Sequence, residues 1–455
     1  MSARFMSFCE AYSSHFIDRG RNSVEHARRY VSGLLGRQRR KNMETICWDV
    51  EGADYQGLEQ FVSASPWDER ALLDQLARQA DGLLGGEGSG LYIDETSFVK
   101  KGGSSVGVKR QYCGRLGKLE NCQVAVFACL GKGQRCVPVD YELFLPEDWA
   151  SDQARCGKAG VPPDRRVHRT KPELALEMVL RARANGVRFG WVGGDALYGS
   201  NAELVNGLED AGESFLCDVC SSAKFWDSRP RLRRRKPAGS MGRPQTRERR
   251  SARCRAGYLT VAQMCDRWFE PEARTVAVRQ SAKGRLAFRF MAREVWAWEP
   301  GWGKPRRRLL LMRRNEDGSF KFSVSNFPPE TGWDRLAYMQ AQRFWIEHCF
   351  HETKSQLGMA QYQVRKWRGW RHHMALVCLA ALFVIEEQIR AREEMPLLSA
   401  RDITELLDIY LPRRERSEAE IRRQIQQRHR ARQRDIDRRR GKVVGLSPGD
   451  AADFI

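Results

Sequence analysis

The sequence of 455 residues lacks an apolar run long enough to span a lipid bilayer. A spanning helix needs about 20 mostly apolar residues, whereas the most apolar run, MALVCLAALFVI, covers only residues 374–385 and has helical spacing. The first residues, MSARFMSFCEAYSSHF, also lack the uninterrupted apolar stretch of a signal peptide. We therefore expect a core helix at 374–385, no membrane partner and a cytoplasmic location.

A regular cysteine framework is missing as well. The 13 cysteines are an odd number without repeated spacing, which favours reduced thiols in a cytoplasm over a set of disulfides. Cys217 and Cys220 form one CDVC pair, but no second pair follows at the spacing of a zinc ribbon. Buried or incidental thiols are the favoured interpretation of this pair.

Acidic residues are outnumbered, because 78 lysines and arginines face 57 aspartates and glutamates and give a formal net charge of +21. Such a balance favours a polyanionic partner over an acidic protein or a small metabolite. Nucleic acid is the first candidate, and a membrane surface is the rival that the short apolar run disfavours.

The chain begins with a predicted helical region at residues 1–88. One helix is expected from Asn22, its N-cap, to Gly36, and a second from Ser65 with Pro66 at its first position. We interpret this region as a DNA-binding domain.

Strand and helix patterns alternate over residues 89–220 and predict a mixed α/β sheet with covering helices. The expected elements are strands at 90–98, 121–130 and 135–145, a helix at 172–184, a strand at 187–199, a helix at 201–211 and a strand at 214–219.

The remaining chain divides into three predicted parts. Residues 221–332 form a β-rich insertion with an arginine-rich lead-in at 229–255, and residues 333–395 return to helices that complete the sheet domain. Residues 396–455 form a helical, basic tail, for which a bare solvated segment is the alternative.

The segment FWIEHCFHETKSQLGM, residues 344–359, predicts an amphipathic helix. At about 100° per residue, Glu347 and Lys354 lie about 20° apart, with Arg343 and His351 about 40° to either side. This geometry selects Glu347 rather than Glu352 as the inward carboxylate. An apolar stripe beside it would bind the helix to the sheet: Ile346, Phe350 and Leu357.

Two other interpretations of this helix are open. A zinc site would use His348 and His351 with Cys349 or a glutamate, but the HExxH spacing is absent. An ordinary surface helix with ion pairs is the simplest alternative. Asp94 and Asp195 lie at predicted strand positions and favour a third interpretation of the helix. Together with Glu347 they could hold two divalent ions about 4 Å apart for phosphoryl transfer on DNA.

Several motifs in order resemble the DDE transposases of bacterial insertion sequences. They are IDETSFVKKGGSSVGVKRQYCGRLGKLENCQVAV at 93–126, GGDALYG at 193–199, and RFWIEHCFHETKSQLGM followed by VRKWRGWRHHMALV. The resemblance spans roughly residues 90–385. It implies a ribonuclease-H-like catalytic domain that a β insertion interrupts before the glutamate.

The resemblance also implies the site. Asp94, Asp195 and Glu347 would be the catalytic, metal-binding triad for two Mg²⁺ ions, with Mn²⁺ as a substitute, and Arg343 and Lys354 would contact DNA phosphates. The family often has a tyrosine three residues before this arginine, where the chain has a glutamine. Four further basic residues are weaker candidates for phosphate contact, with surface lysines as the alternative: Lys100, Lys101, Lys109 and Arg110. Three tryptophans of the insertion either stack on a flipped base or pack in a core: Trp296, Trp298 and Trp302.

The expected function is cut-and-paste transposition by a bacterial, nucleoid-associated protein. It would bind the terminal inverted repeats of its element, cleave double-stranded DNA at the ends and join the 3′ ends to target DNA, as a homodimer in the synaptic complex. A catalytically silent DNA-binding regulator derived from a transposase is the alternative, and a zinc-dependent hydrolase is a third hypothesis.

Overall fold

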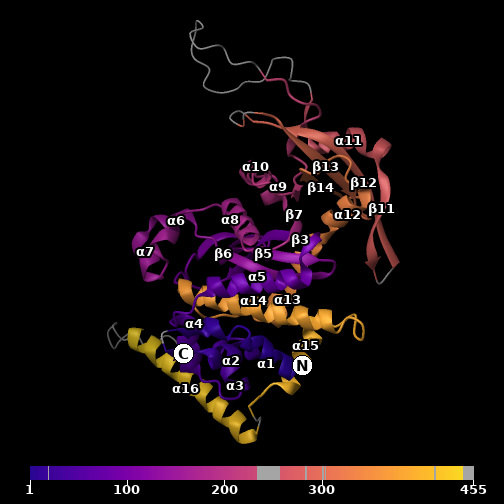
Figure 1. Ribbon diagram of the computed structural model, residues 1–455. Coiled ribbons are helices and arrows are strands. Elements are labelled where there is room, and N and C mark those ends of the chain that lie inside the picture. Colours follow the sequence, from indigo (N-terminus) through magenta and orange to yellow (C-terminus); the bar gives the residue numbers. More distant parts are fainter. Residues whose placement is uncertain are drawn as a thin grey trace.

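The structure is a computed structural model that describes residues 1–18, 20–232, 257–281, 284–299, 302, 304–414 and 417–443. Most of the arginine-rich lead-in expected at 229–255 and the end of the tail beyond 443 lie outside the described residues. A large mixed sheet with helices on both faces makes up the centre of the molecule (Figure 1).

Twelve strands of the described chain form one sheet. The path runs β10-β9-β12-β13-β14-β8-β7-β3-β5-β4, with β6 paired to β5 and β11 to β12. The central strands are β3 (Gly86–Val99), β4 (Lys109–Cys113), β5 (Lys118–Lys132), β6 (Arg135–Leu143), β7 (Phe189–Gly194) and β8 (Phe215–Val219). β3 is antiparallel to β5 and parallel to β7, which is parallel to β8. The predicted mixed α/β sheet is confirmed.

Two groups of helices cover this part of the sheet. One face carries α8 (Lys171–Ala184), α9 (Ala196–Gly199) and α10 (Ala202–Asp210). The opposite face carries α5 (Glu69–Leu84), α13 (Phe344–Gln356) and α14 (Trp367–Arg390), which separate the sheet from the N-terminal helices (Figure 1). Two short helices follow β6 at the side of the sheet: α6 (Glu147–Ser151) and α7 (Gln153–Lys158).

Helices make up most of the described N-terminal region, but both predicted helix starts are wrong. Ser23 rather than Asn22 is the N-cap of the first, and Asp68 caps the second, three residues after Ser65, by accepting from two backbone N–H groups. A cap depends on local backbone geometry, which composition does not fix. The helices are α1 (Ser2–Glu10), α2 (Val24–Leu34), α3 (Met43–Asp49), α4 (Tyr55–Ser63) and α5.

Helix α14 contains the apolar run and is buried, as predicted. It is the one described helix long and apolar enough to cross a membrane, yet 83% of its most apolar window is buried inside the protein. It packs against α2, α4, α5 and β6. This burial is typical of a central core helix, since lipid would have to reach a surface that protein already covers.

The predicted β-rich insertion continues the central sheet. Its strands are β9 (Lys224–Trp226), β10 (Tyr258–Thr260), β11 (Arg274–Ser281), β12 (Gly284–Ala297), β13 (Arg306–Arg314) and β14 (Phe320–Ser325), with α11 (Val261–Glu272) beside them. β14 pairs with β8, so the sheet runs without interruption from the insertion into the centre. Trp298 is buried, as expected for a core tryptophan.

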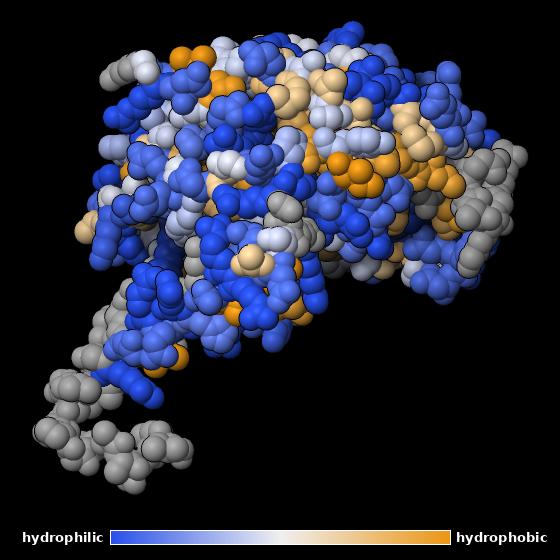
Figure 2. Space-filling model, turned by 90° about the horizontal axis from the view of Figure 1, so that it is seen from below, coloured by the Kyte–Doolittle hydropathy of each residue, from blue (hydrophilic) through white to orange (hydrophobic). Residues whose placement is uncertain are grey.

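The end of the described chain lies against the N-terminal helices. α12 (Trp333–Gln342) leads into α13, and α15 (Ala400–Tyr410) into the long α16 (Glu418–Val443), whose Arg428 stacks on Trp48 of α3. Figure 2 views the molecule from this side, and hydrophilic residues cover most of the visible surface. Ten lysines and arginines against four acidic residues make α16 strongly basic.

Acid should destabilise the fold through His373. Burial lowers the pKa of His373 to about 3, and its Nδ1 lies 2.8 Å from the Tyr30 hydroxyl. Since the unfolded chain binds a proton near pH 6.5 and the folded chain does not, the free energy of unfolding should fall by about 1.4 kcal/mol per pH unit below pH 6.5. Urea unfolding at pH 7 and pH 5 measures this slope, and His373→Gln should show a slope smaller by that amount. Equal slopes would contradict a neutral buried histidine.

Candidate active site

Two aspartates lie side by side at the carboxyl end of β7, next to the parallel strand β3. We call this end of the central strands the acidic edge. The register pairs Ile93 with Gly194, so the next residues, Asp94 and Asp195, occupy neighbouring positions. Asp195 directly follows β7 and caps the short α9, where Oδ1 accepts the Leu197 N–H at 2.9 Å. Parallel pairing therefore brings together two acids separated by about a hundred residues in the chain.

The two glycines of the GGDALYG motif make room for two tyrosine side chains beside the aspartates. A Cβ on Gly193 would lie 2.8 Å from the ring of Tyr92, and one on Gly194 would lie 2.9 Å from Cβ of Tyr198. Real Cβ atoms essentially never come so close. The motif thus supplies both the carboxylate and the space that lets two buried tyrosines pack beside it.

One guanidinium links the acidic edge to α13. Arg343, between α12 and α13, lies 2.9 Å from Oε1 of Glu347, 2.8 Å from Oδ2 of Asp218 and 3.5 Å from Oδ2 of Asp94. The side chain of Arg343 is 21% exposed and the two aspartates are buried more deeply, so its ion pairs with Asp94 and Asp218 are poorly screened by water. Glu347 is therefore connected to Asp94 through Arg343.

Asp218 was not singled out by the sequence analysis. β8 pairs with β7 so that Gly194 faces Cys217, which places Asp218 beside Asp195 along the same edge. Its carboxylate also pairs with Lys321 at 3.0 Å and accepts a hydrogen bond from the Ser323 hydroxyl at 2.8 Å. The signal was present in the CDVC motif, whose aspartate lies within the strand predicted at 214–219.

Glu95 is a second acid that the sequence analysis did not assign. Its carboxylate pairs with Lys171 at 2.6 Å and accepts a hydrogen bond from the Tyr198 hydroxyl at 2.9 Å. Successive residues of a strand point to opposite faces, so Glu95 is directed away from the face of Asp94. It therefore supports α8 and α9 and adds negative charge near Asp195.

The crowding of acids changes their ionisation. Burial raises the pKa of Asp94 to about 7, and the negative charges of Asp195 and Glu95 act in the same direction while Arg343 opposes them. Burial and the charge of Glu95 likewise raise the pKa of Asp195. Buried carboxylates that repel one another are stabilised by a nearby cation.

Glu347 and Glu352 are arranged differently from the expectation. The side chain of Glu347 is 57% exposed and that of Glu352 only 23%, so Glu347 is not the inward carboxylate of the pair. The predicted apolar stripe is buried, and Phe350 packs on Phe127 of β5 with ring centres 5.6 Å apart. A helical wheel fixes the angles between side chains, but the packing of α13 decides which flank of the stripe is open.

The predicted basic residues have separate surroundings. Burial lowers the pKa of Lys354 to about 8, and Asp94 is among the charges that act on it. Lys100 lies 3.4 Å from the ring centre of Tyr362, and burial lowers its pKa also to about 8. Lys109 is exposed and pairs with Asp148 at 3.0 Å, whereas Lys101 and Arg110 are exposed.

The acidic edge has the chemistry of a divalent-metal site. Asp94, Asp195 and Glu347 offer carboxylate oxygens, the ligands that Mg²⁺ prefers, and the raised pKa values of the two aspartates indicate a need for positive charge. Within the described chain, the three carboxylates do not all approach within 4.8 Å of one another. Two ions about 4 Å apart do not require that they should. The zinc set of His348, His351 and Cys349 is not gathered either.

Fold and site together define an α/β protein with clustered carboxylates at one sheet edge. Comparison with known families then identifies the chain: residues 18–285 match the family of DDE superfamily endonucleases, and the chain belongs to it. Endonucleases of this superfamily generally use divalent metal ions. The resemblance to DDE transposases of insertion sequences is confirmed.

Two individual proteins are similar to the chain. It is 30% identical over 216 residues to the "Probable transposase for insertion sequence element IS701" of Microchaete diplosiphon, a match over 47% of this chain and about half (53%) of that relative. A piggyBac transposase synaptic complex with hairpin DNA is 8% identical, with a TM-score of 0.39, over 93% of this chain and 79% of that one. The TM-score is too low to support an argument about the fold.

Removal of Arg343 should expose the repulsion within the site. Arg343→Ala leaves three carboxylates without their shared counter-charge, so the free energy of unfolding should fall by about 3 kcal/mol in metal-free buffer. Millimolar Mg²⁺ should recover part of the loss. Arg335→Ala is the matched control, because its ion pair with Glu87 is exposed and contributes little. Equal losses in both variants, measured by urea unfolding, would contradict a bridging role.

Proposed function

We propose that this protein is a cut-and-paste transposase. It binds the terminal inverted repeats of its element, cleaves double-stranded DNA at the ends with divalent metal and joins the 3′ ends to target DNA. The observation that supports this most is the adjacent, in-register placement of Asp94 and Asp195, with Glu347 connected to Asp94 through Arg343. Membership of the DDE endonuclease superfamily supports the same reaction class.

Asp94, Asp195 and Glu347 are the proposed catalytic and metal-binding residues. When bound, two Mg²⁺ ions, or Mn²⁺ in their place, would supply positive charge for the attacking and leaving oxygens of an in-line displacement. Asp94 and Asp195 are fixed by the sheet, while Glu347 lies on a helix and is 57% exposed. In this proposal the strands give the site its rigid part and α13 brings the third carboxylate toward it.

Basic residues near the acids are proposed to hold DNA. The negative charge of Asp94 acts on the pKa of Lys354, which lies on the same helix as Glu347. This position supports contact between Lys354 and a phosphate close to the cleaved bond. Arg343 would have to release at least one carboxylate to bind a phosphate. The weaker phosphate candidates are Lys100, Lys101, Lys109 and Arg110, of which Lys109 already has an acidic partner.

The finer organisation is proposed in the same way. The catalytic domain is ribonuclease-H-like, formed by residues 89–220 and 333–395, and the insertion at 221–332 interrupts it. Residues 1–88 are a helical DNA-binding domain, and residues 396–455 are a basic tail. The helices α1 to α5 and the continuous mixed sheet support these assignments. The active assembly is a homodimer on paired element ends, acting at the bacterial nucleoid.

Isosteric replacement of the proposed metal ligands should abolish cleavage and leave DNA binding intact. Asp94→Asn, Asp195→Asn and Glu347→Gln each remove a negative charge at constant size, so the rate of Mg²⁺-dependent cleavage should fall at least about 1000-fold. The measurement uses supercoiled plasmid that carries the element ends, with Mg²⁺ or EDTA.

Glu352→Gln on the same helix is the matched control and should keep the cleavage rate within a few-fold. Loss of cleavage in Glu352→Gln but not in Glu347→Gln would refute the site. A wild-type protein that binds the ends without cutting them under any metal condition would favour the silent regulator.

The basic helix α16 should contribute to the salt dependence of DNA binding. Arg430, Arg432 and Arg434 are exposed on this helix. Replacing all three with glutamine should reduce the slope of log affinity against log salt by up to about 3, because each phosphate contact contributes about 0.9. Fluorescence anisotropy at salt concentrations between about 50 and about 300 mM, a range that includes the physiological concentration, measures the slope. An unchanged slope would exclude these arginines as phosphate contacts.

A further inference from the structure

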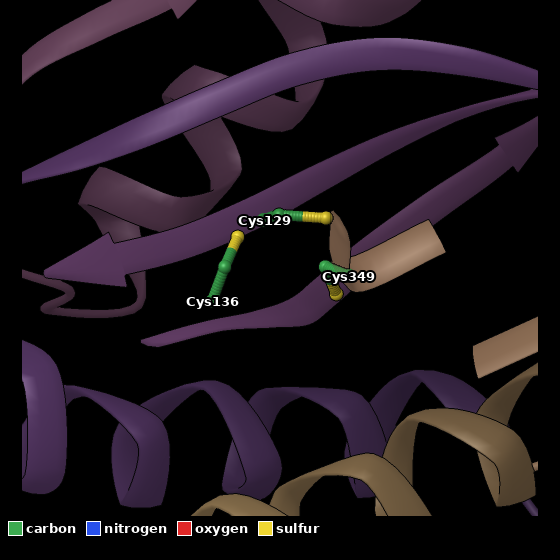
Figure 3. A group of neighbouring side chains, drawn as sticks. All are labelled: Cys129, Cys136 and Cys349. Carbon is green, nitrogen blue, oxygen red and sulfur yellow. The ribbon is translucent and has the colours of Figure 1, made fainter. Parts of the chain in front are cut away.

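Three cysteines from separate segments meet between α13 and the strands β5 and β6. Cys129 lies on β5, Cys136 on β6 and Cys349 on α13, and their side chains surround one small space (Figure 3). All three are buried, and their Sγ atoms lie within 4.8 Å of one another. In the described chain they are the one group of three cysteine, histidine or acidic residues so closely placed.

The spacing and chemistry of this group suit a thiophilic metal. A Zn–S bond of about 2.3 Å in a tetrahedral site implies sulfur atoms about 3.8 Å apart, so no pair of these sulfurs, all within 4.8 Å of one another, needs to approach by more than about 1 Å. The three thiols also hydrogen-bond one another. Thiolate sulfur is a preferred ligand of zinc.

The surroundings can balance the charge of such a site. Cys136 and Cys349 line a pocket of 870 Å³ together with Arg135 and Arg392. Burial, together with the charge of Arg392, lowers the pKa of Arg135, whose Nε is buried without a hydrogen-bond partner among the described residues. Two neighbouring guanidinium groups favour a negatively charged neighbour, and zinc bound by three thiolates carries a net negative charge.

We propose that Cys129, Cys136 and Cys349 bind one Zn²⁺ ion, with the fourth position of the metal open to the pocket. Binding converts three thiols into thiolates and releases three protons to solvent. Sulfur ligands select zinc over Mg²⁺, which prefers oxygen, so this site and the carboxylate site take different metals.

The zinc site would fasten α13 to the sheet. Cys349 lies two residues from Glu347, and Cys129 faces Tyr92 across the β3–β5 pair that also contains Asp94. Without the metal, α13 is held on this side by apolar contacts such as Phe350 on Phe127. Coordination adds bonds from the helix to two strands, so zinc would raise stability and restrict the position of Glu347.

Metal titration of the purified full chain tests the proposal. In millimolar Mg²⁺, which fills the carboxylate site, chelator-treated protein should bind one equivalent of Zn²⁺, and Co²⁺ in its place should give a thiolate charge-transfer band in the near ultraviolet. The thermal midpoint should rise by a few degrees. Cys129→Ser and Cys136→Ser should lose the band, while Cys265→Ser, which removes a buried thiol from α11, should retain it.

X-ray absorption of the zinc-loaded wild type gives an answer that requires no variant. A shell of about three sulfur atoms at about 2.3 Å supports the site. A shell of oxygen and nitrogen alone, or a wild type that binds no zinc and shows no cobalt band, overturns it. DNA cleavage is measured separately, so neither result depends on whether the protein is a transposase.

Discussion

The crowding of carboxylates at one edge of the sheet is the constraint around which this structure is organised. Parallel strands β3, β7 and β8 place Asp94, Asp195 and Asp218 at neighbouring positions, and burial together with nearby negative charge raises the pKa of Asp94 and of Asp195. Arg343 offsets part of this repulsion by pairing with three carboxylates at once. The same arginine lies at the junction of α12 and α13, so the electrostatics of the sheet edge also position the helix that carries Glu347.

Helix α13 therefore has two polar flanks separated by a buried apolar stripe, and each flank carries residues of one proposed metal site. Glu347 and Lys354 face the acidic edge, while Cys349 and Glu352 face the pocket lined by Arg135. The first flank carries the proposed catalytic glutamate, and the cysteine group gives the second a distinct chemical character.

Much of the central architecture could be predicted from the sequence. The hairpin of β5 and β6 and the glycine-terminated β7 are encoded by short-range apolar periods and by turn residues, which act within a few positions of the chain. The start of α5 was misplaced because proline at a first helical turn and aspartate at an N-cap are both plausible signals, and only backbone geometry separates Pro66 from Asp68. Asp218 could not be assigned from the CDVC motif, because only the pairing of β8 with β7 places it beside Asp195.

The sequence by itself determined the main strands of the central sheet, the basic character of the chain and the candidate acids Asp94, Asp195 and Glu347, because these depend on local pattern and composition. Tertiary structure alone decided that Asp218 lies beside the other acids and that Arg343 pairs with three carboxylates. It also decided that Glu347 is more exposed than Glu352 on α13, and that three cysteines distant in the sequence meet. Strand register and helix packing are long-range properties, and residues separated by a hundred or more positions become neighbours only when the chain closes around its core.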